Sequence, residues 1–182
     1  MDKKKWSILV TVLLVLGVAS WVFAENQEGT GGNGVPEFTQ SFASKQIYPG
    51  ETWNIYLNAS DPDGNMKYLF AVVEQPGVGT YPVSIIRIRE KNQKEFSGHL
   101  YLNTSPGAYE LNFTTLTLTI HIRDKKGNFS NPVVFPLEIQ SRNYQEKPPS
   151  GVFRDETLGP IMVKLRSNSH EGGGSSSIIL NN

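Results

Sequence analysis

Two runs of strictly alternating apolar and polar residues, separated by a short polar turn, constrain the fold of this chain more than any other feature. Alternation with a period of two places one set of side chains on one face of a half-buried β-strand. The apolar set comprises Leu116, Leu118, Ile120 and Ile122 in the first run and Val133, Phe135, Leu137 and Ile139 in the second. The turn contains Asp124, Gly127 and Asn128, which bond their own backbone or accept positive φ. The sequence therefore predicts a β-hairpin over residues 116–139.

Turn signals rich in glycine, proline, asparagine and aspartate recur about every ten residues from Pro49 to Asn128, which leaves room for seven strands, including the two of the hairpin. The expected strands span residues 40–48, 52–60, 66–74, 82–89, 95–103, 114–124 and 131–140. The expected core, opposite the hairpin, comprises Trp53, Ile55, Leu57, Phe70, Val72, Phe96, Leu100 and Leu102. Seven short strands with this spacing predict an all-β fold, a single immunoglobulin-like antiparallel β-sandwich.

Two turn-containing segments resemble a known family. Residues 119–130, TIHIRDKKGNFS, resemble the strand F, D-x-x-G-N-x-S turn and strand G of bacterial immunoglobulin-like domains from exported and surface proteins. Residues 59–65, ASDPDGN, are similar to the turn between strands B and C of the same domains. The resemblance covers residues 40–140 and implies a β-sandwich in an exported protein. The chain departs from antibody-type domains, because it has no cysteine and the tryptophan of the expected sandwich, Trp53, lies in the second strand instead of the third.

The N-terminal residues 1–24 have the features of an export signal. Lysines 3–5 precede an apolar run from Ile8 to Val18, and Val22 and Ala24 form an A-x-A-like pattern, which predicts a signal peptide cleaved after Ala24. An uncleaved membrane anchor is the alternative, because residues 6–24 are uncharged and long enough to cross a bilayer. Both alternatives place the remaining chain outside the cytoplasm, in the periplasm, in the cell envelope or in the extracellular space. Membrane contact is expected only through residues 6–24, and only if they stay attached.

The 182-residue chain has room for one ordinary domain once its ends are set aside. We expect a flexible leader at 25–37, the sandwich at 38–141, a linker with an extra edge strand at 142–169, and a disordered Gly/Ser tail at 170–182. The alternating residues Ile161, Val163 and Leu165 indicate the extra strand. That strand either extends the same sandwich or pairs with a partner protein.

Four oxygen-bearing residues are candidate metal ligands. In an immunoglobulin-like sandwich the turns at residues 61–65, 89–95 and 124–128 meet at one pole. Asp61, Asp63, Asn65 and Asp124 would supply the hard oxygen ligands that Ca²⁺ prefers. The same residue types also bond the backbone N–H groups of D-x-D-G and D-x-x-G-N turns, and the twelve-residue calcium-loop spacing is absent. A role in turn structure is therefore the favoured alternative, and no other cofactor is expected.

The opposite pole collects glycine- and proline-rich turns that carry Tyr81 and Tyr109. Tyrosine rings on rigid turns can anchor a protein or a sugar. Isolated exposed tyrosines are also common on protein surfaces without any such role. Tyr81 and Tyr109 are thus candidate binding residues, with ordinary surface tyrosines as the alternative.

No recognisable catalytic motif is present in the sequence, which contains three histidines and lacks G-x-S-x-G, H-E-x-x-H and phosphate-loop patterns. A formal net charge of zero argues against nucleic acid as a partner. The first hypothesis is a non-catalytic exported module of the cell envelope with a structural or protein-interaction role, whose partner is another envelope or extracellular protein. A glycan- or Ca²⁺-binding module is the alternative, and an enzyme with a convergent site is a further one.

Overall fold

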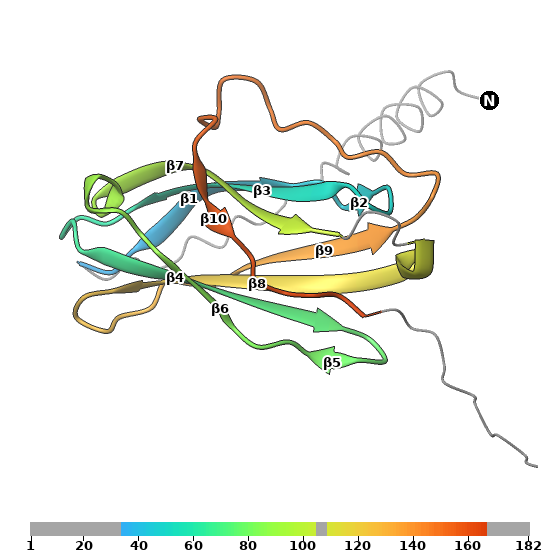
Figure 1. The fold of residues 1–182 in the computed structure, drawn as a ribbon. Helices are drawn as coiled ribbons and strands as arrows, with labels where there is room; N and C mark the ends of the chain where they lie inside the picture. Colours follow the sequence, from blue (N-terminus) through green and yellow to red (C-terminus); the bar gives the residue numbers. More distant parts are fainter. Residues whose placement is uncertain (1–33, 105–108, 167–182) are drawn as a thin grey trace, which may run out of the picture. The chain divides into compact units, whose positions relative to one another are not determined.

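The computed structural model describes residues 34–104 and 109–166, and these residues fold into two packed β-sheets (Figure 1). The predictions for the signal segment 1–24, for leader residues 25–33 and for the tail 170–182 concern residues outside the described ranges. Among the described residues, no helix is long and apolar enough to cross a membrane.

Ten strands and two 3-10 helices follow one another along the described residues. The strands are β1 (Glu37–Ala43), β2 (Gln46–Ile47), β3 (Thr52–Ser60), β4 (Met66–Gln75), β5 (Gly79–Thr80), β6 (Ser84–Arg87), β7 (Glu95–Asn103), β8 (Thr114–Asp124), β9 (Val133–Ile139) and β10 (Thr157–Pro160). The 3-10 helices are η1 (Glu90–Asn92) and η2 (Tyr109–Leu111). The fold is therefore all-β, as the alternating pattern predicts.

The strand order is that of an immunoglobulin-like sandwich. The four-stranded sheet has the order β1-β3-β7-β10, and the six-stranded sheet has the order β2-β9-β8-β4-β5 with β6 also paired to β4. Strands β1, β3 and β7 thus occupy the A, B and E positions in one sheet, whereas β4, β8 and β9 occupy the C, F and G positions in the other. The β2–β9 and β10–β7 pairs are parallel, whereas the other strand pairs of the described residues are antiparallel.

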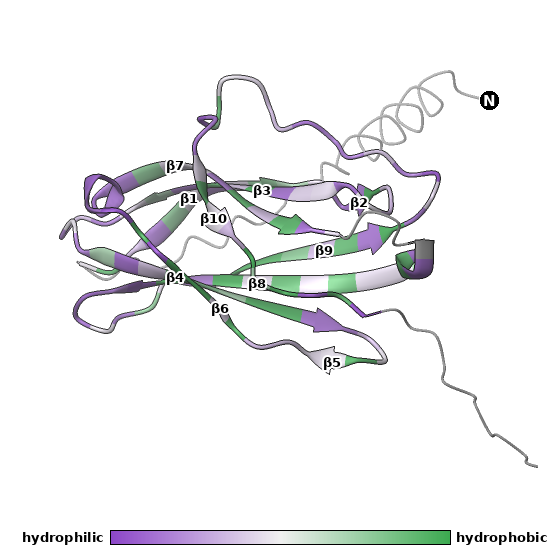
Figure 2. Ribbon diagram, in the orientation of Figure 1, coloured by the Kyte–Doolittle hydropathy of each residue, from purple (hydrophilic) through white to green (hydrophobic). Residues whose placement is uncertain are grey.

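The predicted hairpin is β8 and β9, and its apolar face forms the centre of the core. Leu116 lies opposite Leu137 and Leu118 lies opposite Phe135, so the two inward sets are in register. Figure 2 shows this pattern as alternating bands of hydropathy along β8. Trp53 in β3 closes the core from the other sheet, where it is fully buried and its indole N–H donates a 2.8 Å hydrogen bond to the carbonyl of Ser44. The core therefore consists of inward side chains from both sheets.

The first predicted strand, residues 40–48, is in fact two strands that belong to different sheets. β1 pairs antiparallel with β3, whereas β2 pairs parallel with β9. The chain changes sheet at Ser44, whose buried hydroxyl donates to the carbonyl of Gln46 at 2.6 Å and accepts the N–H of Glu146 at 2.9 Å. A side chain that satisfies backbone groups locally offers an alternative to ladder bonds, which explains the break.

The prediction that Phe70 and Val72 face the core is wrong. Leu69, Ala71 and Val73 are buried, and Phe70 and Val72 lie on the outer face of the six-stranded sheet. A register irregularity between Met66 and Tyr68 shifts β4 against β8, and an extra residue in a strand reverses the faces of all later side chains. The alternation of apolar and polar residues could not show which face of β4 is buried, because this strand carries apolar side chains on both faces.

Residues 140–156 wrap around the sandwich instead of leaving it as a linker, and Figure 1 shows them arching over the four-stranded sheet. The side-chain amide of Gln145 accepts the N–H of Asn54 and donates to the carbonyl of Thr52, both at 2.9 Å. Farther along, the Phe153 ring lies 5.7 Å from the Tyr56 ring. The segment thus covers the outer surface of β3.

After this crossing, the chain runs along the free edge of β7 as β10. Strand D occupies this edge in a constant-type immunoglobulin domain, but here β6, which follows β5, pairs with β4 in the other sheet. Gly98 permits the close approach, because a Cβ there would lie 2.3 Å from the carbonyl oxygen of Glu156. The extra strand was expected at the alternating residues Ile161, Val163 and Leu165. The observed strand β10 instead ends at Pro160, and residues 161–166 have no regular strand structure.

Candidate functional site

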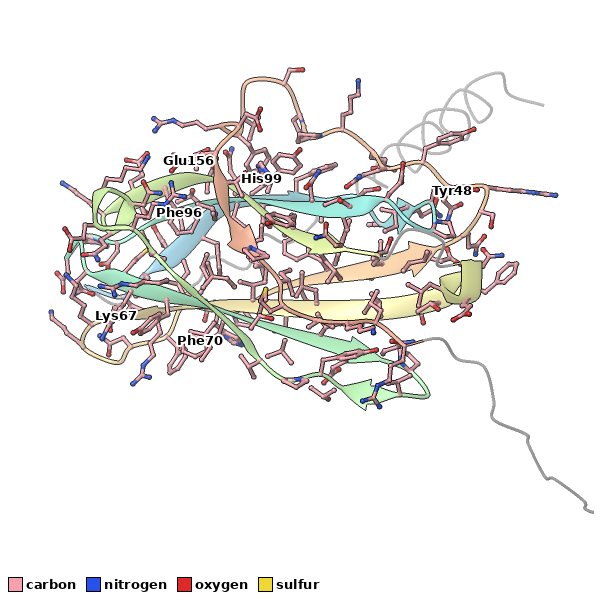
Figure 3. The ribbon with its side chains drawn as sticks, viewed as in Figure 1. Tyr48, Lys67, Phe70, Phe96, His99 and Glu156 are labelled. Atoms are coloured by element: carbon pink, nitrogen blue, oxygen red, sulfur yellow. The ribbon has the colours of Figure 1, made fainter. Side chains whose placement is uncertain are left out.

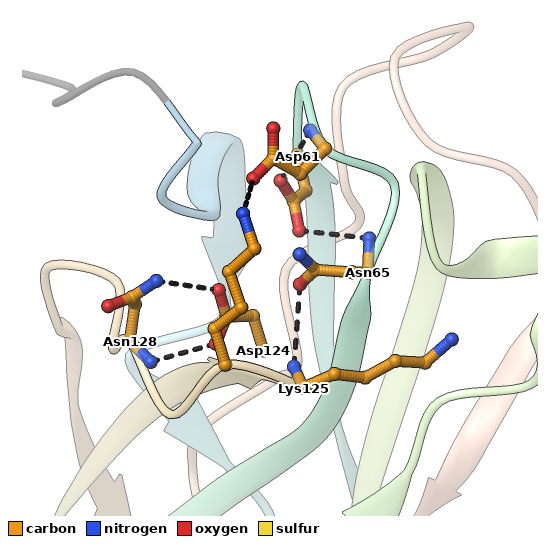
Figure 4. A network of polar contacts seen from close by, with 7 residues as sticks. Asp61, Asn65, Asp124, Lys125 and Asn128 are labelled. Carbon is orange, nitrogen blue, oxygen red and sulfur yellow. Dashed lines mark hydrogen bonds and ion pairs between the residues drawn. The ribbon is translucent and has the colours of Figure 1, made fainter.

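The structure brings together the three charged turns that the sequence places at one pole, and Figure 4 shows the polar contacts of the turns at residues 61–65 and 124–128. The N–H of Asp61 donates to the carbonyl of Lys94 at 2.9 Å, and the N–H of Lys125 donates to the carbonyl of Asn65 at 3.0 Å. The turns before β4, before β7 and after β8 are therefore joined through their backbones. Asp61, Asn65 and Asp124 all lie within this cluster.

The buried carboxylates of the cluster are occupied by hydrogen bonds within their own turns. The two oxygens of Asp61 accept the N–H groups of Asp63 at 2.9 Å and Asn65 at 3.2 Å. The two oxygens of Asp124 accept the backbone N–H of Asn128 at 2.7 Å and its side-chain amide at 2.9 Å. Asp61 and Asp124 are 1 % and 2 % exposed. Their geometry is that of side chains that stabilise turns.

The remaining carboxylate of the cluster, that of Asp63, holds a lysine. The Nζ of Lys126 lies 2.5 Å from Oδ2 of Asp63, and this hydrogen bond and the negative charge of Asp63 raise the pKa of Lys126. An ammonium group in this position competes with any dication. Among the described residues, no group of three or more histidine, aspartate or glutamate side chains is arranged to hold a metal ion. The geometry therefore favours turn structure over a Ca²⁺ site.

The two tyrosines predicted to be surface anchors do not form a described surface. Tyr81 is 8 % exposed, and its hydroxyl donates to Oε1 of Gln75 at 2.5 Å and accepts the N–H of Arg166 at 2.9 Å. Its ring belongs to the core and its hydroxyl fixes the end of the C-terminal segment. Tyr109 begins η2, and its side chain lies outside the described part of the structure.

Polar side chains also meet where β10 joins β7. The Nε2 atom of His99 lies 3.2 Å from Oγ1 of Thr157, and its Nδ1 atom lies 3.9 Å from Oδ1 of Asp155. An acid, a histidine and a hydroxyl in this order also occur in hydrolytic triads. Here the distance from Nδ1 to the carboxylate exceeds a hydrogen bond, and the Asp155 side chain is fully exposed. We therefore assign these contacts to the attachment of β10.

An apolar surface on the outer side of the six-stranded sheet is the strongest candidate binding site, and we call it the aromatic face. It comprises the outward side chains Tyr68, Phe70, Ile85, His121, Phe129 and Val134. Phe70 lies opposite Ile85 on β6 and His121 on β8. The Phe129 ring lies 5.8 Å from the Phe70 ring and 6.3 Å from the His121 ring. Figure 3 shows Phe70 on the side of this sheet turned away from the four-stranded sheet.

The aromatic face is open to solvent, unlike the outer side of the other sheet. Ile85, Phe129 and Val134 are 60 %, 52 % and 55 % exposed. Adjacent exposed apolar side chains mark interaction surfaces on soluble proteins, whereas isolated ones do not. On the four-stranded sheet, the corresponding Tyr56 ring is instead packed against Phe153. Only one of the two outer sheet faces is thus covered by the described residues.

Three cations border the aromatic face near the charged turns. The Nζ atom of Lys67 lies 5.1 Å from the centre of the Tyr68 ring, and the guanidinium of Arg123 lies 5.5 Å from the centre of the Phe129 ring. Arg87 lies opposite Tyr68 in the strand register. The ion pairs among the described residues involve other side chains, so all three positive charges remain available. Arginine side chains beside aromatic rings, such as Arg123 beside Phe129, are typical of protein interfaces.

The outward acidic side chains of this sheet lie at its other end. Glu74 is near the end of β4, and Glu138 is near the end of β9, where it lies opposite Thr115. The charge on the outer face is therefore separated along the strands, with cations around the aromatic face and acids away from it. An approaching acidic partner is attracted to one end only.

Sequence reasoning missed the aromatic face because it assigned Phe70 to the core and treated Phe129 as part of a turn. A signal was present in residues 68–73, YLFAVV, where apolar side chains occupy both faces of one strand. Such a strand either is buried on both sides or presents an apolar surface. The distinction depends on whether another segment covers the outer side, which the strand sequence does not encode.

Comparisons with family models and with curated proteins give no match. Among solved structures, the chain is similar to the CARDB domain of a Pyrococcus furiosus protein in complex with di-metal ions, with a TM-score of 0.32 and 7 % identity over 58 % of this chain and 85 % of that one. It is also similar to the PKD domain of a peptidase from a Thermoplasmatales archaeon, with a TM-score of 0.34 and 14 % identity over 60 % of this chain and 99 % of that one. At these values, the immunoglobulin-like assignment rests on the strand order of this chain.

Proposed function

We propose that this protein is a non-catalytic interaction module that binds another protein through the aromatic face. The observation that carries the proposal is the exposure of Ile85, Phe129 and Val134 beside aromatic rings on a sheet face that no described segment covers. Protein interfaces combine an apolar centre with arginine and aromatic side chains and exclude water from that centre. The aromatic face has this composition.

The charges around the aromatic face define the partner. Lys67, Arg87 and Arg123 surround the apolar centre without acidic neighbours among the outward side chains at that end of the sheet. A complementary surface therefore carries an apolar patch bordered by aspartate or glutamate. Electrostatic complementarity of this kind sets the association rate and the orientation of the complex.

The location of the partner follows from the sequence. Residues 1–24 have the pattern of an export signal, so the partner is a protein of the cell envelope or the extracellular space. Within the described residues, the histidines contribute to the aromatic face (His121) and to the attachment of β10 (His99). These positions support a module that binds without catalysing a reaction.

Affinity capture from envelope and culture-supernatant extracts tests this proposal, with the wild-type protein compared with two variants. The first variant, Ile85→Ser with Val134→Ser, changes the aromatic face, and the matched control, Tyr144→Ser with Phe113→Ser, changes two exposed apolar residues elsewhere. Quantitative mass spectrometry should show one acidic protein captured by the wild type and the control but lost from the first variant. Equal capture by all three proteins, or capture of further copies of this chain only, would contradict the proposal.

A further inference from the structure

An open groove lies on the outer side of the four-stranded sheet, away from the aromatic face, and has a volume of about 270 Å³. Its floor consists of the cross-strand pairs Asn58–Ser97 and Ser60–Glu95 of β3 and β7. One wall is the crossing segment from Gly151 to Arg154. The hollow forms above Asn58, Ser60 and Ser97, whose side chains are short, whereas farther along the same strands the rings of Tyr56 and His99 fill the surface.

The wall of the groove is held in place by the sheet. The side-chain amide of Asn58 donates to the carbonyl of Val152 at 3.0 Å, and the N–H of Arg154 donates to Oγ of Ser97 at 2.8 Å. The ring of Phe153 packs against that of Tyr56. The segment can turn there because Gly151 adopts a φ of 76°, which other residues rarely accept. The groove is therefore a built part of the fold.

Several polar groups in the groove have no partner in the described part of the chain. The structure gives no hydrogen bond or ion pair to the hydroxyl of Ser60, the carboxylate of Glu95 or the guanidinium of Arg154, although all three residues line the groove. The hydroxyl of Ser60 can donate and accept hydrogen bonds, the carboxylate of Glu95 accepts them, and the planar guanidinium of Arg154 donates them. A ligand with several hydroxyl groups can satisfy all three.

We propose that this groove binds one residue of a neutral saccharide. Opposite charges on Glu95 and Arg154 disfavour ligands with a strong net charge, and the hydroxyl and amide floor disfavours apolar ligands. The Phe153 side chain, which lines the groove, supplies an apolar wall against which the C–H groups of a sugar ring can pack. The volume is near the lower end of the range for small-molecule sites, and the open ends allow the rest of a glycan chain to extend into solvent.

The experiment uses isotope-labelled protein that comprises residues 25–182. It is titrated with maltotriose, cellotriose and triacetylchitotriose in turn, and the backbone amide signals are followed by NMR. Trigalacturonic acid serves as the anionic comparison. At least one neutral trisaccharide should shift the amide signals of Ser60, Glu95, Ser97 and residues 151–154. Absence of such shifts with all three neutral sugars, shifts confined to other surfaces, or equal binding of trigalacturonic acid would overturn the proposal.

Two variants sharpen this test. Ser60→Leu fills the floor, and Glu95→Gln removes the charge while preserving the shape, so the second variant keeps the test decisive if the first perturbs folding. Each should weaken binding of the neutral sugar at least about tenfold, which corresponds to about 1.4 kcal/mol. The control Thr119→Ala lies on the outer side of the other sheet and should bind normally. Unchanged affinity in Glu95→Gln would overturn the assignment, independently of any result on the aromatic face.

Discussion

The carboxylates of Asp61 and Asp124 act as fixed parts of the turns in which they lie. Each is nearly inaccessible to solvent and accepts two hydrogen bonds from groups in its own turn. Bonds from backbone N–H groups to a charged acceptor are stronger than those between neutral groups. The acidic residues at this pole therefore stabilise the fold, and their presence alone does not indicate a metal site.

Replacing Asp124 by alanine should destabilise the protein by about 1–3 kcal/mol, because the substitution removes both bonds to Asn128 in a buried position. Urea unfolding measures this loss. Lys125→Ala is the matched control, since its side chain is exposed and should change stability by less than about 0.5 kcal/mol. A Ca²⁺-dependent rise in wild-type stability that Asp124→Ala abolishes would instead support a metal site.

Glu156 links stability to pH through its contacts with η1. A hydrogen bond from Lys91, with another from Asn92, lowers the pKa of Glu156 below its usual value of 4.5. Because the pKa is lower in the folded state, the contribution to stability is present above the unfolded pKa and is lost as pH falls through the folded one.

Glu156→Gln should therefore be less stable than the wild type at neutral pH, and the difference should shrink as the pH falls below the usual Glu156 pKa of 4.5. Urea unfolding at a series of pH values checks this dependence, and an NMR titration of the Glu156 carboxyl checks its pKa directly. Lys91→Gln should move that pKa back toward 4.5. A difference between wild type and Glu156→Gln that is constant with pH would contradict this assignment.

At the scale of the elements, the segment from Gln140 to Pro160 completes the sandwich. It covers β3 on the outer face and then occupies the edge of β7 that strand D occupies in related topologies. With no cysteine in the chain, no disulfide can secure this segment. Packing and hydrogen bonds therefore hold it in place.

Gly98→Ala should detach β10, because the added Cβ would meet the carbonyl oxygen of Glu156 at 2.3 Å. We expect a loss of about 1–3 kcal/mol, the usual cost of overpacking. Hydrogen exchange should become faster at two N–H groups that join β7 to the C-terminal segment. These are the N–H of His99, which donates to the carbonyl of Glu156, and the N–H of Ile161, which donates to the carbonyl of Tyr101. Thr115→Ala, at an exposed position of β8, is the control, and unchanged exchange in Gly98→Ala would disprove the role of Gly98.

The sequence was sufficient to predict the strands whose two faces differ clearly. The β8–β9 hairpin, β3 and β7 alternate cleanly, and their inward sets are buried. β4 was assigned the wrong face because it is apolar on both sides and a bulge shifts its register. β10 was placed too late in the chain because Gly159 and Pro160 are disfavoured in strands, and its pairing with β7 depends on the close approach that Gly98 permits.

The meeting of the three charged turns at one pole could be predicted from the expected strand order, because in an immunoglobulin-like sandwich the order of the strands decides at which end each loop lies. The aromatic face and the groove could not be predicted in this way. Each depends on where residues 140–156 lie, since this segment covers one sheet and leaves the other open. That path is set by long-range contacts such as those of Gln145 with β3, which no local pattern encodes.

At the scale of the whole sandwich, the two outer faces have different roles. The outer side of the four-stranded sheet is partly covered by residues 140–156 and holds a polar groove, whereas the six-stranded sheet presents the aromatic face with its cations.

Because exposed charges are screened by salt, binding through the aromatic face should weaken as ionic strength rises. Surface plasmon resonance on a captured partner should show a slower association rate at high salt and for Arg123→Glu. An association rate that is independent of salt would argue against the cationic border.

Site-specific photo-crosslinking tests the central claim most directly. A photoreactive phenylalanine analogue is placed at Ile85 or Val134 of the aromatic face, and at Tyr144 or Phe113 as exposed controls, in the full-length protein inside the cells that produce it. We predict that Ile85 and Val134 yield a discrete adduct with one acidic protein, that the controls do not, and that Arg87→Glu with Arg123→Glu removes the adduct. Adducts of equal yield at Tyr144 and Phe113, or none at Ile85 and Val134, would contradict the assignment of the aromatic face as the binding surface.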